Sequence, residues 1–307
     1  MTLQNLTDNF AIPGALEFSE TDTGLLRAHI TTPSCTAELY LQGAHLTAWQ
    51  PTGEKPVIFL SERSPFAEGK AIRGGVPIIF PWFGARLSTP ESPRTDGPAH
   101  GFARASEWTL AFAALAGDDM HLTLTLGPSD TSRALGWDHF QLAFELKLGR
   151  ELRMRLTVAN QSTAPMRFEE ALHTYFTVSD ATTIAINGLA NTEYLDKTDS
   201  FKRKTQLEPT LHITKETDRL YLNTTETVTL DDPGFHRRIT VAKSNSNSSV
   251  VWNPWSTLAA KMADMTPENW RSMTCIETVN AMENNIQLAP TQTHTMEAHI
   301  TVDPLAS

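Results

Sequence analysis

The sequence predicts an all-β protein built as an antiparallel β-sandwich. Segments in which apolar and polar residues alternate occur along most of the chain, and this alternation is typical of half-buried strands. Turn-forming residues separate these segments at intervals of roughly ten residues. Helical periodicity is almost absent, so an alternation of strands and helices around a parallel sheet is disfavoured.

The clearest predicted strands lie in the middle of the chain. Alternation is regular over 122–126 and 140–148, and it resumes over 152–158 after Gly149. The last two segments predict a β-hairpin whose turn conformation is supplied by Gly149. Further strands are predicted at 183–187, 226–230, 238–243, 249–252 and 294–302.

The segments between the strands carry turn and loop signals. A turn is predicted at 232–234, where Asp-Pro-Gly separates two strands, and one short helix is predicted at 258–265. The proline-rich segment 81–98 is interpreted as a binding-site loop, and the serine- and asparagine-rich run 244–249 as a polar turn. No linker, change of composition or internal repeat marks a boundary, so a single domain over residues 1–307 is predicted.

The composition restricts the class of partner. With a formal net charge of -10 and a sequence pI ≈ 5.5, the chain as a whole repels nucleic acid and acidic membrane surfaces, so an anionic ligand needs a local basic site. Cys35 and Cys275 are too few for a disulfide framework and are expected to be reduced. Neither a secretion signal nor a run of about 18 apolar residues is found, so we expect a soluble cytoplasmic protein.

Two clusters combine a cation with flexible glycines. In the segment 71–84, Arg73 lies beside a glycine pair, and its planar guanidinium is suited to bind phosphate or carboxylate through two donors. A surface salt bridge is the alternative. The motif His100-Gly-Phe-Ala-Arg104 follows the proline-rich loop, and on a strand His100 and Arg104 would share one face and point into the same pocket. A histidine that serves only as a structural hydrogen-bond donor is the alternative there.

Three further positions place ionisable groups beside apolar or aromatic neighbours. His173 lies in the strand-like run 168–176, where burial and nearby carboxylates shift the pKa of an imidazole and can prepare it for proton transfer. Glu277 lies between apolar residues, as a general base in a partly desolvated site does. A core histidine and an exposed strand glutamate are the alternatives. Asp218 and the segment 252–255, with its two tryptophans, add groups of the kind that bind sugars.

Motifs of other reaction classes are missing from the sequence. It contains no spacing typical of metal ligands, no glycine-rich nucleotide fingerprint and no nucleophile elbow. We therefore expect a reaction that needs no cofactor, no metal and no covalent serine. Proton transfer is the chemistry that remains.

Five motifs together resemble one known family. They are Arg73-Gly-Gly-Val-Pro77, Phe80-Pro-Trp-Phe-Gly84, His100-Gly-Phe-Ala-Arg104, Leu172-His-Thr-Tyr-Phe176 and Glu277. In this order they resemble the glucose-6-phosphate 1-epimerase family, the hexose-6-phosphate mutarotase branch of the aldose 1-epimerases, from about Leu41 to Val302. The resemblance implies the galactose-mutarotase-like fold, a large twisted antiparallel β-sandwich with its active site on the concave face of a sheet.

The resemblance also implies roles for individual residues. His173 corresponds to the general acid and Glu277 to the general base. Substrate contacts are implied at Arg73, His100, Arg104 and Asp218. The sequence departs from the family at Ala99, where relatives usually have a polar or basic residue, and Arg86 and Arg94 in the preceding loop are candidates for a replacement cation.

The expected activity is the interconversion of the α and β anomers of a hexose 6-phosphate, with glucose 6-phosphate as the expected substrate, by a monomer that binds neither nucleic acid nor membrane. An aldose 1-epimerase acting on free sugars would use the same catalytic pair. A non-catalytic carbohydrate-binding sandwich could use Trp82, Trp252 and Trp255 as sugar platforms. A glycosidase would need paired carboxyl groups such as Glu169 and Glu170, but adjacent strand residues point to opposite faces.

Overall fold

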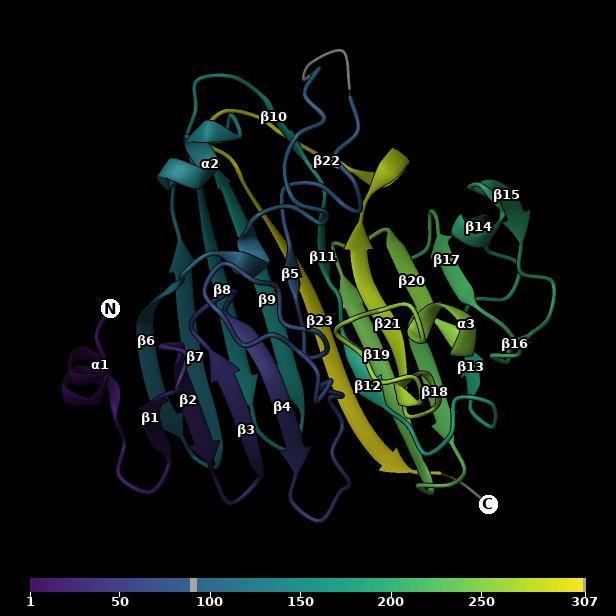
Figure 1. Cartoon of the computed structure of the whole chain (residues 1–307), viewed down its shortest axis with the longest axis horizontal. Coiled ribbons are helices and arrows are strands. Elements are labelled where there is room, and N and C mark those ends of the chain that lie inside the picture. Colours follow the sequence, from purple (N-terminus) through teal and green to yellow (C-terminus); the bar gives the residue numbers. More distant parts are fainter. Residues whose placement is uncertain (89–92, 306–307) are drawn as a thin grey trace.

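Antiparallel β-sheets make up most of the structure. The computed structural model describes residues 1–88 and 93–305. A nine-stranded sheet extends across the back of the view in Figure 1, and a four-stranded and an eight-stranded sheet lie in front of it. All pairings between the described strands are antiparallel. The predicted all-β, antiparallel sandwich is confirmed.

Each sheet combines strands from different parts of the chain. The nine-stranded sheet contains, in spatial order, β16 (Thr210–Leu211), β13 (Ala185–Asn187), β18 (Val228–Asp232), β19 (Arg237–Ser244), β23 (Thr293–Pro304), β9 (Leu152–Asn160), β8 (Phe140–Leu148), β7 (Asp119–Leu126) and β6 (Thr109–Ala116). The four-stranded sheet contains β1 (Leu16–Glu20), β2 (Leu26–Thr31), β3 (Cys35–Tyr40) and β4 (His45–Pro51). The eight-stranded sheet contains β15 (Lys202–Thr205), β14 (Glu193–Asp196), β17 (Thr217–Tyr221), β20 (Ser248–Asn253), β21 (Met273–Asn280), β11 (Glu170–Leu172) and β5 (Ile78–Ile79), with β12 (Tyr175–Thr177) also paired to β21.

The remaining elements are short. A two-stranded sheet is formed by β10 (Met166–Phe168) and β22 (Ile286–Leu288). The helices are α1 (Leu3–Phe10), α2 (Asp130–Ala134) and α3 (Trp255–Ala259), with 3-10 turns η1 (Ala103–Ala105), η2 (Lys197–Asp199), η3 (Asn269–Arg271) and η4 (Met282–Asn284). Within the described residues, every helix is too short or too polar to cross a membrane. Both cysteines are free and buried.

The strands predicted from alternation are found in the sheets. The predicted hairpin is formed by β8 and β9, and the segment 122–126 lies within β7. The later predicted strands overlap β13, β18, β19, β20 and β23. The polar turn predicted at 244–249 connects β19 to β20, which belong to different sheets, and the turn predicted at 232–234 connects β18 to β19.

Two local predictions are wrong. Gly149 does not adopt the left-handed conformation; a Cβ atom at this position would require the carboxylate of Asp119 to move. The helix predicted at 258–265 is also wrong, since α3 ends at Ala259. Met265 is buried in a cluster with Tyr175, and this tertiary packing overrides the local helical pattern.

The main hydrophobic core lies between the two layers. Buried and partly exposed residues alternate along β8, whose buried face belongs to this core, and burial of each large apolar side chain contributes about 1.5–3 kcal/mol. On β21, Ile276 points into the main core, whereas Cys275 and Val279 belong to clusters on the other face of the sheet. Because side chains alternate along a strand, Glu277 lies on that outer face.

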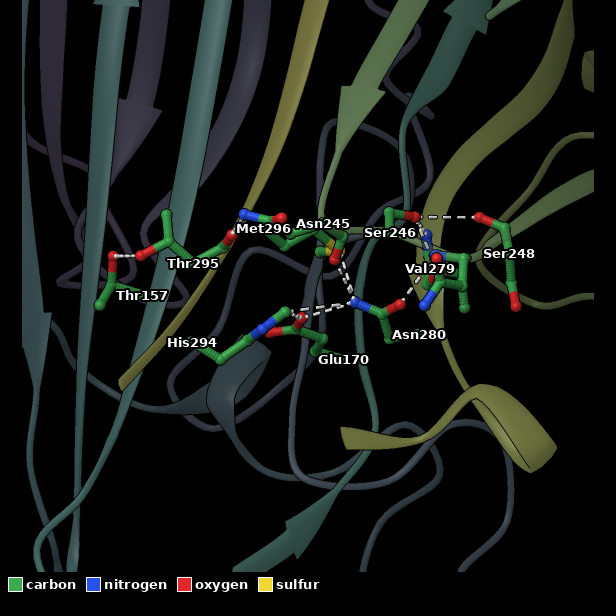
Figure 2. Close-up of polar contacts among 11 residues, drawn as sticks. Thr157, Glu170, Asn245, Ser246, Ser248, Val279, Asn280, His294, Thr295 and Met296 are labelled. Carbon is green, nitrogen blue, oxygen red and sulfur yellow. Dashed lines mark hydrogen bonds and ion pairs between the residues drawn. The ribbon is translucent and has the colours of Figure 1, made fainter. Parts of the chain in front are cut away.

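A buried polar cluster connects the two layers beneath this outer face. Figure 2 shows Asn280 of β21 with Glu170 of β11 and His294 of β23. The Asn280 side-chain amide donates to Glu170 Oε1 at 2.9 Å, and His294 Nε2 lies 2.9 Å from the same oxygen. The Ser246 hydroxyl donates to the carbonyl of Val279 at 2.9 Å. These contacts fix β11 and β21 against the nine-stranded sheet.

The ion pair between His294 and Glu170 predicts a pH-dependent stability. Burial lowers the pKa of His294, but the hydrogen bond and the charge of Glu170 outweigh this effect and raise the pKa above 6.5. The stability that the pair contributes is therefore complete below pH 6.5 and is lost as the pH rises through the raised pKa. We expect the wild type to have a higher free energy of unfolding than the double variant E170Q/H294Q. The difference between the two proteins should be largest at acidic pH. Denaturant titrations between about pH 5 and 8 measure this difference, and a constant difference would contradict the assignment.

Candidate active site

Two neighbouring strand segments bring the predicted acid and base together. The strand-like run 168–176 is divided into β10, β11 and β12, and His173 follows the last residue of β11. The pairing of β11 with β21 sets Leu172 opposite Thr278, and the same register places His173 opposite Glu277. The His173 Nε2 and Glu277 Oε1 atoms are 3.3 Å apart. Two residues that are distant in the sequence therefore form one site.

His173 is a buried imidazole. Its exposed fraction is 8%, and its ring stacks on Tyr175 with centroids 4.8 Å apart and planes 12° from parallel. Burial lowers the pKa of His173 well below 6.5, and the neighbouring His100 and the cations Arg104 and Arg73 lower it further. The neutral imidazole is therefore favoured.

Glu277 is buried even more completely, with an exposed fraction of 2%. Burial raises the pKa of this carboxyl well above 4.5; the charge of Lys197 lowers it and the charge of Asp218 raises it. The protonated carboxyl is therefore favoured. Together with a neutral His173, the pair holds one proton, which is the number that a cooperating general acid and general base require.

The two pKa shifts predict the pH dependence of turnover. Groups with the ordinary values of 4.5 and 6.5 would share one proton only between those two pH values. Because burial raises the pKa of Glu277 and lowers that of His173, both groups are driven toward their uncharged forms, and this uncharged pair also carries one proton. We expect kcat to be level around pH 7, with its alkaline limb above 6.5. Steady-state rates across the pH range check this, and a loss of activity centred at 6.5 would instead indicate an independent imidazole.

Aromatic side chains line one side of the His173–Glu277 pair. The rings of Trp252 and His173 have centroids 6.2 Å apart, and Trp252 lies 5.8 Å from Tyr175. Of the three tryptophans considered as sugar platforms, only Trp252 occupies this position. Trp255 packs against another tryptophan of η3, and Trp82 packs in the main core.

Arg73 forms a salt bridge at the edge of the site, next to Tyr175. Its Nε and Nη2 atoms each lie 2.9 Å from Asp264 Oδ2, and its Nη1 donates to the Tyr175 hydroxyl at 2.9 Å. The pair is half-buried, unlike the surface salt bridge considered from the sequence. Because Tyr175 stacks on His173, Arg73 holds the ring that supports the imidazole.

His100 and Arg104 reach the site, but the strand expected to present them is not formed. His100 adopts a left-handed conformation with φ 65°, and Arg104 lies in η1. Gly101 permits this path, because a Cβ atom there would overlap the carbonyl of Phe80. The rings of His100 and His173 are nevertheless 5.6 Å apart. His100 therefore lies beside His173 on a turn and not on the strand considered from the sequence, and substrate contacts at His100 and Arg104 stay predictions.

Asp218 reaches the site from β17 and is paired with a residue that the sequence did not indicate. Lys197 of η2 lies with its Nζ atom 2.9 Å from Asp218 Oδ2 and 5.3 Å from the centroid of the Phe83 ring. Lys197 lies in a polar turn, Lys-Thr-Asp, whose composition resembles that of any surface turn. Its position beside Asp218 is visible only in the folded structure.

Buried polar atoms without a hydrogen-bond partner are concentrated at the candidate active site. Within residues 1–88 and 93–305, seven buried side-chain nitrogen or oxygen atoms have no hydrogen-bond partner. Four of them belong to predicted site residues, namely Arg104 Nε, His173 Nδ1, Asp218 Oδ1 and Glu277 Oε2. Buried polar atoms without partners are rare in folded proteins. A ligand rich in hydroxyl groups would satisfy both the donors and the acceptors of this set.

One metal-ligand combination exists within the site. His173, Cys275 and Glu277 offer donor atoms that all lie within 4.8 Å of one another, and these are donor types that zinc accepts. Zinc binds the thiolate form of cysteine, but burial raises the pKa of the Cys275 thiol well above 9.0. Forming a thiolate ligand at this buried position would therefore cost free energy.

The carboxylates considered for a glycosidase point to different places. Glu169 accepts hydrogen bonds from the backbone N–H groups of Phe83 and Met282, each at 2.7 Å. Glu170 lies in the cluster between the layers. They do not face a common ligand, so this geometry does not support a glycosidase pair.

The proline-rich loop approaches the site at one end. The ring of Phe83 lies 4.9 Å from that of His100. Arg94 pairs with Asp96 at 2.5 Å, and Arg86 stacks on the Trp82 ring at 4.6 Å. Residues 89–92 of the predicted loop lie outside the described residues.

The fold and the paired acid–base groups define a class of sugar-converting enzymes, and the comparisons agree with it. The sequence pattern of the family described as aldose 1-epimerase matches residues 27–301. The chain belongs to this family.

Individual relatives within the family indicate a narrower group. An Escherichia coli K12 protein named "Putative glucose-6-phosphate 1-epimerase" is 34% identical over 252 residues, which is 82% of each protein. A protein with the same name from Cenchrus ciliaris is 30% identical over 267 residues, covering 84% of this chain and 78% of the relative. The crystal structure of a Salmonella typhimurium protein described as "a putative mutarotase (YeaD)" superposes with a TM-score of 0.87 at 30% identity, over 96% of each chain. The mutarotase fold expected from the resemblance is confirmed.

Proposed function

We propose that this protein interconverts the α and β anomers of a hexose 6-phosphate, with glucose 6-phosphate as its expected substrate. The observation that carries the proposal is the 3.3 Å approach of His173 to Glu277 on the outer face of the eight-stranded sheet. The names of the relatives support the same substrate. We further propose that the enzyme acts as a monomer in the cytoplasm.

The reaction is an opening and reclosure of the sugar ring. Glu277, as a carboxylate, removes the proton of the C1 hydroxyl while His173 donates a proton to the ring oxygen, which releases the aldehyde. Rotation about C1–C2 and reclosure with reversed roles give the other anomer, and no net proton is consumed. Hydroxyl groups that donate to the unused Glu277 Oε2 stabilise the carboxylate and thereby shift the shared proton toward His173.

Arg104 is the cation best placed for the phosphate. Both arginines were expected to contact the substrate, but the charge of Arg73 is already compensated by Asp264. Arg104 donates to the carbonyl of Ala99 at 2.7 Å, its Nε has no partner, and none of the ion pairs among the described residues involves it. A guanidinium with unused donors binds a phosphate well.

A coupled assay tests the proposal. Pure α-glucose 6-phosphate is offered to a β-specific dehydrogenase with and without the protein, and α-glucose is tested in parallel with a β-specific glucose dehydrogenase. We expect the protein to accelerate β-anomer formation above the spontaneous rate mainly for the phosphorylated sugar. Acceleration only with free glucose would assign an epimerase of free sugars, and acceleration with neither would leave a sugar-binding protein.

A further inference from the structure

Lys197 lies at the site beside Asp218 and the ring of Phe83. The 3-10 turn that carries it is held by Asp196, whose side chain accepts from the backbone N–H of Thr198 at 3.0 Å. Asp196 also pairs with Lys204 at 2.8 Å. The turn is thus fixed at the end of β14, and the Lys197 ammonium is directed over β17 toward Asp218.

Both partners of the Lys197–Asp218 pair have hydrogen-bonding groups that the pair itself does not use. The two side chains are 22% and 17% exposed, so the pair is largely removed from water. An ammonium has three donors; one faces Asp218, and the cation also contacts the ring of Phe83. On the carboxylate, Oδ2 is engaged and the buried Oδ1 has no partner among the described residues. A donor and an acceptor are therefore available side by side.

We propose that Lys197 is a substrate-binding residue, which donates to a hydroxyl oxygen of the sugar while Asp218 accepts the proton of a sugar hydroxyl. This inference rests on the proposed function. A hydroxyl group both donates and accepts, so it matches the pair, whereas a phosphate would be repelled by the Asp218 carboxylate. The Lys197–Asp218 pair thus recognises the sugar ring, and Arg104 recognises the phosphate.

Lys197 has a second effect through its charge. Glu277 and Asp218 are two carboxyl groups at the same face, and Asp218 raises the pKa of Glu277. The Lys197 cation acts in the opposite direction. Without it, the uncompensated charge of Asp218 would hold the proton on Glu277 more strongly. Loss of Lys197 should therefore move the alkaline limb of kcat to higher pH.

Three variants test the two roles of Lys197, which are sugar binding and the effect of its charge on Glu277. K197M and K197Q remove the positive charge, and K197R keeps it. We expect K197M to raise KM by about tenfold or more for both glucose 6-phosphate and glucose, because the lost contact is to the ring. The alkaline limb should shift upward in K197M and stay near the wild-type position in K197R. Lys147 provides a matched control, since it pairs with Asp119 at 2.9 Å on the nine-stranded sheet. K147M should leave both quantities unchanged.

Binding of the two sugars, followed by the fluorescence of Trp252 and the other tryptophans, separates the two proposals. A wild type that binds glucose 6-phosphate without accelerating its mutarotation would contradict the proposed function alone. Wild-type affinity in folded K197M and K197Q, or a loss confined to the phosphorylated sugar, would overturn the role of Lys197 and leave the mutarotase intact. A wild type that binds neither sugar would overturn both. Circular dichroism of each variant establishes that it is folded.

Discussion

Replacement of Glu277 by glutamine should lower kcat for anomer interconversion by about 10²–10⁴-fold, with little change in KM. Glutamine keeps the size and hydrogen-bonding shape of the side chain but cannot carry a proton between the C1 hydroxyl and the His173 imidazole. The variant H173N should lose a similar factor, because the pair holds a single proton that both groups must exchange. Initial rates in the coupled assay measure these losses after subtraction of the spontaneous rate.

The double variant H173N/E277Q provides a control on the idea that the two groups act as a unit. Residues that act together in catalysis show effects that are far from additive. We expect the double variant to be hardly slower than either single variant. If the loss of kcat in the double variant equals the product of the two single losses, His173 and Glu277 act independently. Near-normal turnover of either single variant would exclude that residue as an acid or base.

Replacement of Arg104 by methionine should raise KM for glucose 6-phosphate by about 10–100-fold and leave the kinetics with free glucose nearly unchanged. The lost contact is a charge-assisted hydrogen bond to a group that only the phosphorylated sugar carries. Separate kinetics with the two sugars give the comparison directly.

Arg94 is a matched control for this variant. Its guanidinium is exposed and already paired with Asp96 at 2.5 Å. We expect R94M to behave as the wild type with both sugars. An equal effect of R104M on both sugars would assign Arg104 to the sugar ring, and a selective effect of R94M would move the phosphate site to the proline-rich loop.

Most of the strands that the sequence predicted have one buried face and one partly exposed face, although β20 is buried on both. The segments β8 and β9 alternate over their full length, so their face and their hairpin could be inferred. By contrast, β21 is buried on both faces and shows no alternation. In the four-stranded sheet, a shift of register between Glu38 and Leu39 interrupts the pattern. The strand β21 was not predicted because both of its faces are buried, whereas burial alternates along β2 and this strand could have been inferred.

The contacts that bring the predicted site residues together are not visible in any local sequence pattern. The apolar neighbours of Glu277 were visible in the sequence, but its burial was not, and its approach to His173 depends on the register between β11 and β21. The turn at His100 depends on the contact of Gly101 with Phe80, which local spacing does not reveal. Lys197 was missed because an isolated lysine in a polar turn carries no signal until its neighbours are known.

Catalysed interconversion of the two anomers is tested most directly by two-dimensional exchange NMR on glucose 6-phosphate at its anomeric equilibrium. The cross peaks between the α and β anomeric protons report interconversion without any coupling enzyme. We expect the wild type to produce strong exchange peaks and E277Q to return them to the spontaneous level. Equal exchange with the wild type and E277Q, or no acceleration by the wild type, would contradict catalysis by the His173–Glu277 pair.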